Sequence, residues 1–497
     1  MEIIVKAAGL LLSLSILVVI HELGHFLFAR LFKVRVDKFY MFFNPNFSLV
    51  RAKKIKGKWQ FRFFARNIPD AFRPKLDSDG DPLHDNKGKG IFENIPLEEF
   101  DDADWRKYPE TTEFGLGWVP LGGYCKIGGM LDESMDEGAK TVRYEKWALE
   151  SRPVWQRMFV MAGGVIFNFI LAIIVFAMVL FNWGEQTIPA QNAYMGFNYC
   201  QIALDNGFEN GDRILTINGD TITDISEITS KIIIEGKQNV VVLRGNDSIT
   251  LLLGKDFSEQ WLNVRAKMFI TAIRMPFVVD SVMPNSPAEA IHLQKSDSIV
   301  AVNGKYLADL SLIRQELALC GGKKIDITYF RQNKIFTDSI NISDAGTIGV
   351  GLVNANKYFK TKTLEYGFFS AFPAGLKLGV ETLMSYIKQF RLVFTKAGAK
   401  NVGGFISMGS IFPSTWDWYK FWNMTALLSV ILAFMNILPI PVLDGGYLLF
   451  LLYELITRRK PSDRFMEISL KIGMGLVLAL LVLANGNDIV NWLSKFF

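Results

Sequence analysis

Four long apolar stretches divide the chain and alternate with polar segments. They cover Ile3 to Phe32, Met158 to Gly184, Phe421 to Leu443 and Ile472 to Asn487. A helix needs about 20 predominantly apolar residues to cross the hydrocarbon layer, so the pattern predicts four membrane spans, the last with help from its flanks. The first stretch could also be a cleaved signal peptide. It continues through FLFARLF with no small-residue cleavage site, however, which favours a true span.

The polar segment between the second and third stretches contains an internal repeat. FENGDRILTINGD, which starts at Phe208, aligns with LQKSDSIVAVNGK, which starts at Leu293. Each copy has a polar turn, a short β-rich run, an Asn-Gly turn and a helix-like segment, which is typical of small α+β modules. Ahead of the second copy, Ser286 and Pro287 indicate a helix start. The copies resemble the bacterial type of PDZ domain, although two purely structural modules without a ligand would give the same pattern.

Three further segments have a readable pattern. Residues 364–397 are apolar but regularly interrupted by charge, which predicts an amphipathic helix, either on the membrane surface or packed against the protein. Residues 70–115 are polar and contain the acidic run EEFDDAD at 98–104, which indicates an inserted loop or subdomain of no readable function. Residues 112–129, TEFGLGWVPLGGYCKIGG, alternate glycine with apolar residues and predict a membrane-dipping β-hairpin or, alternatively, a tight turn.

Composition agrees with a membrane protein and excludes several other classes. Half of the 497 residues are hydrophobic, 13% are aromatic, and only 21% are charged. The net charge is +5, without the clustered basic stripe that a nucleic-acid partner requires. The three cysteines, Cys125, Cys200 and Cys320, have no metal-type spacing and cannot all pair. We therefore expect no nucleic-acid partner and no disulfide framework.

Basic residues beside the apolar stretches predict the orientation. Lys and Arg gather after the first span, between Arg30 and Lys58, and again between the third and fourth spans, from Arg458 to Lys471. Such loops stay on the cytoplasmic side. Both termini and residues 185–420 are therefore expected outside, which in a bacterium is the periplasm, with the protein in the inner membrane.

The first apolar stretch contains HELGH, formed by His21, Glu22, Leu23, Gly24 and His25. On a helix, residues four apart share a face, so both imidazoles can bind one Zn²⁺ while Glu22 stands beside the open coordination position. Zinc activates water, and a nearby carboxylate can remove its proton during attack on a carbonyl. Ionisable residues inside a span are costly and usually functional. The alternatives are a polar cluster at the helix end and a metal that only holds helices together.

A catalytic zinc site usually has three protein ligands, so a third is expected elsewhere. His84 lies in the acidic segment and His292 in the second outer module, and both are poor candidates. Asp444 follows the third span, where Pro439 and Pro441 break the helix. The first and third spans both run inward, which brings Asp444 to a depth similar to that of His21. A turn residue at the membrane face is the alternative for Asp444.

Several of these motifs together are similar to those of one known family. They are HELGH, the duplicated modules, PLGGY at residues 120–124, AGGVIFNF at residues 162–169 and NILPIPVLDGG at residues 436–446. Their order resembles the site-2 protease family of intramembrane zinc metalloproteases, specifically the bacterial regulator-of-sigma-E protease type. One departure is Gly403, Gly404 and Phe405, where relatives often have Gly-Gly-Pro.

The resemblance implies a function and the residues that perform it. The activity would be cleavage of trimmed single-span membrane proteins, such as anti-sigma factors or signal-peptide remnants. His21, His25 and Asp444 would bind Zn²⁺, Glu22 would be the general base, and Asn436 would position the substrate. From the sequence pattern, the segment with Gly122, Gly123 and Tyr124 could pair with an extended substrate by strand addition.

The expected fold is a polytopic α-helical membrane protein with two PDZ-like α+β domains between the second and third spans. An alternative function is a membrane-anchored PDZ adaptor with a structural metal site, but such a site would not need a base beside its ligands. The expected parts are the first span 1–32, the β-hairpin region 33–157 with its insertion 70–115, the second span 158–184, PDZ-like domains 185–270 and 271–355, amphipathic helices 356–420, the third span 421–453, a cytoplasmic loop 454–471 and the fourth span 472–490.

Overall fold

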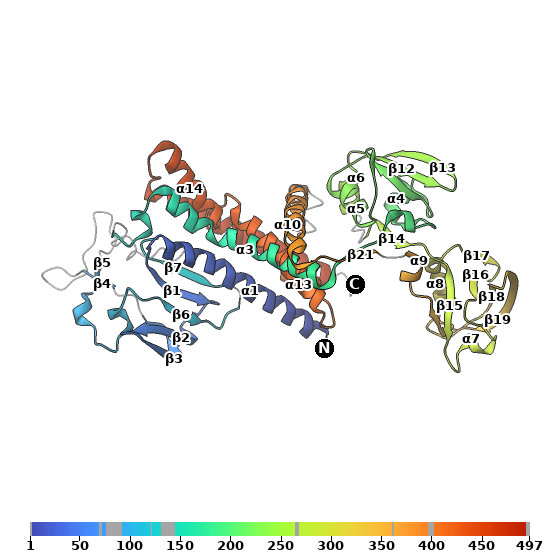
Figure 1. Cartoon of the computed structure of the whole chain (residues 1–497), viewed down its shortest axis with the longest axis horizontal. Coiled ribbons are helices and arrows are strands. Elements are labelled where there is room, and N and C mark those ends of the chain that lie inside the picture. Colours follow the sequence, from blue (N-terminus) through green and yellow to red (C-terminus); the bar gives the residue numbers. More distant parts are fainter. Residues whose placement is uncertain are drawn as a thin grey trace. The chain divides into compact units, whose positions relative to one another are not determined.

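The computed structural model describes residues 2–68, 72–75, 92–120, 122–130, 145–263, 268–359, 362–395 and 402–493 (Figure 1). The chain forms two compact units. The first consists of Met1–Trp183, Tyr366–Ile387 and Val402–Phe497, and the second of Gly184–Glu365 and Lys388–Asn401. The long helices belong to the first unit and the sequence repeat to the second, so each unit is described by itself.

In the part of the chain that the structure describes, four helices are long and apolar enough to cross a membrane, as the hydrophobic pattern predicts. They are α1 (Glu2–Leu31), α3 (Val154–Trp183), α13 (Trp418–Ile437) and α15 (Asp463–Leu493). In α15 the apolar part is Arg464–Val490.

Two helix boundaries differ from the expected spans. The third long helix ends at Ile437, before the end of the expected segment 421–453, and the break falls where Pro439 and Pro441, which have no N–H to donate, predict it. A separate helix, α14 (Asp444–Thr457), then begins. The fourth helix starts earlier than expected, because its first turns carry charges that a hydropathy pattern excludes but a helix tolerates.

Glycines let α1 and α3 cross with their backbones in contact. A Cβ atom at Gly24 would lie 2.2 Å from the carbonyl oxygen of Gly163, and one at Gly164 would lie 2.4 Å from the His21 ring. Only small residues allow such an approach between membrane helices. The metal motif of α1 is therefore pressed directly onto α3. On its other side, α3 packs against α13 through Ala172 and Val430 and their neighbours.

A five-stranded sheet follows α1, in the order β3-β2-β6-β1-β7. Residues 112–129 do not form the predicted hairpin, because β1 lies between β6 and β7 and pairs with both. The alternation of glycine and apolar residues correctly indicated strands, but pairing is decided by contacts with a distant segment. This makes β7 an edge strand. The strands are β1 (Val36–Met41), β2 (Phe47–Ile55), β3 (Lys58–Arg66), β6 (Glu113–Leu116) and β7 (Tyr124–Ile127).

The acidic run packs onto this sheet through ion pairs. Lys107 and Lys56 both donate to Asp102, and these hydrogen bonds lower the pKa of its carboxyl to about 2. Trp105 is buried beneath the Arg62 guanidinium. Residues 70, 71 and 76–91 of the expected 70–115 insertion lie outside the described residues. Its described elements are β4 (Phe72–Pro74), β5 (Phe92–Asn94), η1 (Leu97–Glu99) and η2 (Trp105–Lys107), and η3 (Leu149–Ser151) precedes α3.

The second unit contains two α+β modules. The first module has a four-stranded sheet, β11-β10-β12-β13, and a two-stranded sheet, β14-β9. Its elements are β8 (Glu185–Thr187), η4 (Ala190–Asn192), β9 (Phe197–Tyr199), α4 (Gln201–Asp205), β10 (Arg213–Ile217), β11 (Asp220–Thr221), α5 (Ser226–Thr229), the π-helix η5 (Ser230–Ile234), β12 (Asn239–Arg244), β13 (Asp247–Leu252), α6 (Phe257–Asn263) and β14 (Ile270–Ile273).

The second module has one sheet in the order β19-β18-β16-β15-β20, with β17 paired to β16. Strand β21 pairs with β8. The elements are β15 (Phe277–Val282), α7 (Pro287–Ala290), β16 (Ser298–Val302), β17 (Lys305–Tyr306), α8 (Leu310–Leu319), β18 (Lys324–Arg331), β19 (Lys334–Asn341), β20 (Val350–Leu352), α9 (Asn356–Phe359) and β21 (Lys362–Leu364).

The same buried ion pair recurs in both modules. Arg244 donates to the buried carboxylate of Asp212 in the first, and Arg331 donates to that of Asp297 in the second. In each copy the carboxylate also accepts the backbone N–H three residues before it. These contacts explain why the polar turn ahead of the β-rich run is repeated in the sequence.

The amphipathic segment forms α10 (Phe368–Phe390), which η6 (Arg391–Phe394) and α12 (Phe405–Ser410) follow. One face of α10 packs closely on α3, where a Cβ at Gly375 would lie 2.7 Å from the backbone nitrogen of Ala177. Membrane contact by the other face remains a prediction. That face exposes an apolar stripe formed by Phe369, Phe372, Leu376, Val380, Met384 and Ile387.

Candidate metal centre

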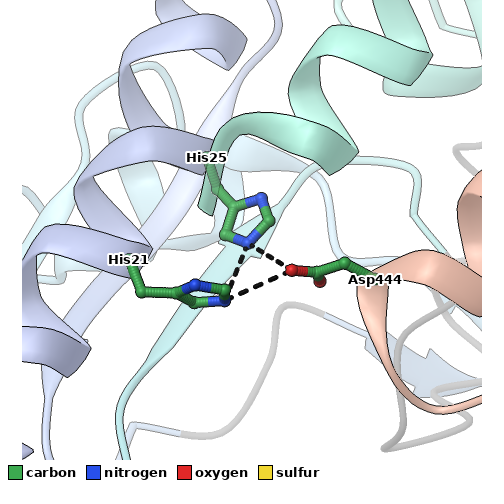
Figure 2. Close-up of side chains that lie close together, drawn as sticks. All are labelled: His21, His25 and Asp444. Atoms are coloured by element: carbon green, nitrogen blue, oxygen red, sulfur yellow. Dashed lines mark hydrogen bonds and ion pairs between the residues drawn. The ribbon is translucent and has the colours of Figure 1, made fainter. Parts of the chain in front are cut away.

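Helix α1 presents His21 and His25 on one face, because they are four residues apart. Figure 2 shows both imidazoles pointing at the carboxylate of Asp444, which comes from the start of α14. Among the described residues, these three form the group of His, Cys, Asp and Glu side chains that could hold a metal ion. His84 lies outside the described residues, and His292 belongs to the other unit.

The backbone between α13 and α14 directs Asp444 toward the histidines. After Pro441, the β-branched Val442 has a φ of 99°, a strained conformation that such a residue adopts only when its surroundings enforce it. Gly445 then lies against the carbonyl oxygens of Ile437 and Leu438 at the end of α13. A Cβ atom at Gly445 would lie 2.3 Å from each of these oxygens. The two prolines, the strained residue and the glycine together interrupt the helix for a few residues, and α14 then starts at Asp444.

The three donor atoms form a nearly equilateral triangle. Nε2 of His21 lies 3.3 Å from Nε2 of His25 and 3.3 Å from Oδ2 of Asp444, and Nε2 of His25 lies 3.4 Å from that oxygen. Tetrahedral Zn²⁺ with ligands at about 2.0–2.1 Å requires donor separations of about 3.3–3.4 Å. Oδ2 of Asp444 is buried and has no hydrogen-bond partner. The residues therefore fit a zinc ion with three protein ligands and an open fourth position.

Each imidazole is also held by α3 through its other nitrogen. Nδ1 of His25 lies 2.8 Å from the carbonyl oxygen of Val160, and Nδ1 of His21 lies 3.1 Å from the side-chain amide of Asn168. Hydrogen bonds of this kind fix the ring orientation of metal-binding histidines. They leave Nε2 of each ring facing Asp444.

Glu22, the predicted general base, lies beside the three donor residues. Its carboxylate interacts with both histidines and Asp444, and it accepts a hydrogen bond from the backbone N–H of Cys125 in β7. Among the described strands, β7 is the last in the order of its sheet, and its Cys125 N–H joins this strand to Glu22.

The remaining residues predicted to bind substrate are placed differently. Nδ2 of Asn436 lies 3.3 Å from Nε2 of His21, at the metal cluster. Gly122 and Gly123 pack tightly, the first against the Phe43 ring and the second against the backbone of Tyr40. Tyr124 donates its hydroxyl to Asn44. The contacts of these last three favour a packing role, and substrate binding by them remains a prediction.

Sequence reasoning missed an ion pair that fixes α14 to α3. Arg157 donates two hydrogen bonds to Glu454, at 2.6 and 3.1 Å, and both side chains are largely buried. Glu454 lies on the helix that begins with Asp444, so the pair helps to place the third ligand. The sequence does show one basic and one acidic residue in apolar segments, Arg157 and Glu454. It does not show that the two side chains meet.

Removing one partner of this pair should destabilise the protein. Arg157→Met leaves Glu454 buried without a counter-charge, which typically costs about 3–5 kcal/mol. The double variant Arg157→Met/Glu454→Leu should recover most of that loss, as measured by chemical denaturation in detergent micelles. Lys377→Met, which breaks an exposed pair with Glu381, should cost about 0.5 kcal/mol or less. Equal destabilisation by the single and double Arg157 variants would contradict the pairing role.

The sequence matches peptidase family M50 over residues 9–66 and 102–480. A "Regulator of sigma E protease" of Haemophilus influenzae is 30% identical over 78% of this chain and 90% of its own length. A "Putative zinc metalloprotease" of Rickettsia conorii is 25% identical over 98% of this chain and 99% of its own. The solved PDZ domain of an SdrC-like protein from Listeria monocytogenes matches 18% of this chain at 20% identity, with a TM-score of 0.16.

The family match covers all three candidate zinc ligands, since the histidines lie in its first matched segment and Asp444 in its second. Zinc is the cofactor of this family, and the donor triangle has the size that zinc requires. The chain therefore belongs to peptidase family M50, the site-2 protease family of membrane-embedded zinc metalloproteases.

Proposed function

We propose that this metalloprotease cleaves single-span membrane proteins in or beside their transmembrane segment, after a first protease has removed their outer part. Anti-sigma factors and signal-peptide remnants are substrates of this type. The observation that carries the proposal is that two of the three donors lie on α1, an apolar helix long enough to span a bilayer. A peptide bond reaches a metal held there only from within or beside the membrane.

In this proposal His21, His25 and Asp444 hold the zinc ion. When bound, zinc polarises the scissile carbonyl and makes water more acidic. Glu22 takes the proton of the attacking water and passes it to the leaving amide nitrogen. The side-chain amide of Asn436, beside His21, donates a hydrogen bond to the carbonyl oxygen as negative charge develops on it.

Strand β7 is the proposed site for an extended substrate. A helical segment hides its peptide bonds in its own hydrogen bonds, so it must be held open for hydrolysis. Among the described strands, β7 is the last in the order of its sheet, and the Cys125 N–H on this strand reaches Glu22. A substrate strand added there would pass the base.

The proposed location is the bacterial inner membrane, with both termini and both PDZ-like modules in the periplasm. The basic residues after the first span and between the third and fourth spans support this orientation. The lipid bilayer and single-span substrates are the proposed partners, and nucleic acid is not among them. In this arrangement the modules stand on the side from which bulky substrate domains would arrive.

Cleavage by the full chain in proteoliposomes tests the function. One single-span test protein carries a short outer tail, and a matched one carries a folded outer domain. We expect cleavage of the first only, located by mass spectrometry within or next to its transmembrane segment. Treatment with a zinc chelator should stop the reaction, and added zinc should restore it. Equal cleavage of both proteins would contradict the need for trimming, and cleavage confined to a soluble region would contradict the intramembrane site.

A further inference from the structure

Helix α3 supplies no metal ligand, yet one of its faces contacts all the elements that do. Four positions spaced three and four residues apart form this face. Arg157 binds Glu454 of α14, the Val160 carbonyl binds His25, and Gly164 lies against His21. Asn168 closes the row by contacting His21, and its backbone oxygen accepts a hydrogen bond from Ser429 of α13 at 2.7 Å.

Asn168 is the member of this row whose side chain contacts a ring nitrogen of His21. It is fully buried, its Nδ2 lies 3.1 Å from Nδ1 of His21, and its Oδ1 is buried without a partner. The two ends of an amide side chain are assigned from the hydrogen-bond network. With Nδ2 donating to Nδ1, the His21 proton would sit on Nε2, the atom that faces Asp444, and Nε2 could not bind a metal.

The opposite amide orientation removes this conflict. If Oδ1 of Asn168 accepts the Nδ1–H of His21, Nε2 presents its lone pair to the donor triangle. His25 already has the equivalent arrangement, since its Nδ1 lies 2.8 Å from the Val160 carbonyl, which can only accept.

We propose that Asn168 is a positioning residue that accepts the Nδ1–H of His21 through Oδ1 and thereby fixes Nε2 as the metal-binding nitrogen. This inference rests on the proposed role of His21 as a zinc ligand. One acceptor on α3 is a backbone carbonyl, which no substitution removes, and the other is the side chain of Asn168. A substitution of Asn168 therefore removes the acceptor of His21, whereas the backbone acceptor of His25 stays in place.

Zinc affinity of the purified full-length protein tests the proposal, measured by competition with a chromophoric chelator. Asn168→Ala should weaken zinc binding about 10–100-fold, the range found when hydrogen-bond partners of metal ligands are removed. Asn168→Asp keeps an acceptor oxygen and should restore most of the affinity. The visible spectrum of the Co²⁺-substituted protein should change in Asn168→Ala and return toward wild type in Asn168→Asp.

Ser429→Ala is the matched control, because it removes a buried hydrogen bond to Asn168 without touching the imidazole. We expect it to lower thermal stability in detergent while zinc affinity stays unchanged. Wild-type affinity in Asn168→Ala, or equal weakening by Asn168→Ala and Asn168→Asp, would overturn the proposal. Failure of the wild-type protein to bind zinc would instead refute the metal site itself, so the two failures are distinguishable.

Discussion

Glu22→Gln is expected to reduce peptide-bond hydrolysis by about 10²–10⁴-fold while the protein keeps its zinc. Glutamine has the size of glutamate and can still accept a hydrogen bond from the Cys125 N–H, but it cannot take a proton from water. The rate constant for cleavage of a trimmed single-span protein in proteoliposomes measures the effect. Metal analysis of the same preparation shows whether zinc is retained.

The control for Glu22→Gln lies on the same helix. Ser15→Ala removes a hydroxyl that is bonded to the Leu11 carbonyl one turn earlier, and it should leave both the cleavage rate and the zinc content close to wild type. A Glu22→Gln variant that cleaves within a factor of about ten of the wild-type rate would show that another group is the base, since general-base catalysis contributes more than that. Loss of zinc from Glu22→Gln would instead assign Glu22 to metal binding.

Asp444→Ala should lose zinc and, with it, nearly all activity. Without its carboxylate the cluster has two imidazoles, fewer than the three protein ligands of a usual catalytic site. We expect zinc affinity to fall by more than about 100-fold, beyond the 10–100-fold effect of removing an outer hydrogen-bond partner. Chelator competition and zinc content per protein chain measure the change.

A second aspartate provides the control for Asp444→Ala. Asp417 caps the start of α13 by accepting the Lys420 N–H, so Asp417→Ala should cost about 1 kcal/mol of stability and leave zinc affinity unchanged. Zinc affinity in Asp444→Ala equal to that of Asp417→Ala would place the third ligand elsewhere. Asp444→Asn, which keeps an oxygen but not the charge, is expected to lie between Asp444→Ala and the wild type.

Features with a local cause could be predicted from the sequence. The four long helices followed from runs of apolar residues, because burial in lipid depends on the composition of each segment alone. The pairing of His21 with His25 followed from the helix repeat. The break before Asp444 followed from Pro439 and Pro441, which cannot continue a helix. These local parts of the site could be predicted because each depends on its own neighbours in the sequence, and zinc binding by His21, His25 and Asp444 stays a prediction.

Features that depend on contacts between distant segments could not be predicted. The sequence placed residues 112–129 in one hairpin, but β1 separates the two strands and leaves β7 at the edge. The role of Asn168 depends on which atom of His21 it meets, and the Arg157–Glu454 pair joins helices far apart in the chain.

The sequence by itself therefore determined the four long apolar helices, the repeat and the residue types of the candidate ligands. Only the tertiary structure decided which strand faces Glu22, which nitrogen of each histidine faces Asp444, and how α3 holds the donors 3.3–3.4 Å apart. The physical reason is the distance along the chain between the residues that interact. Hydrophobicity and helix breaking act between close neighbours in the chain, whereas hydrogen bonds and close packing select among partners that only the folded chain brings together.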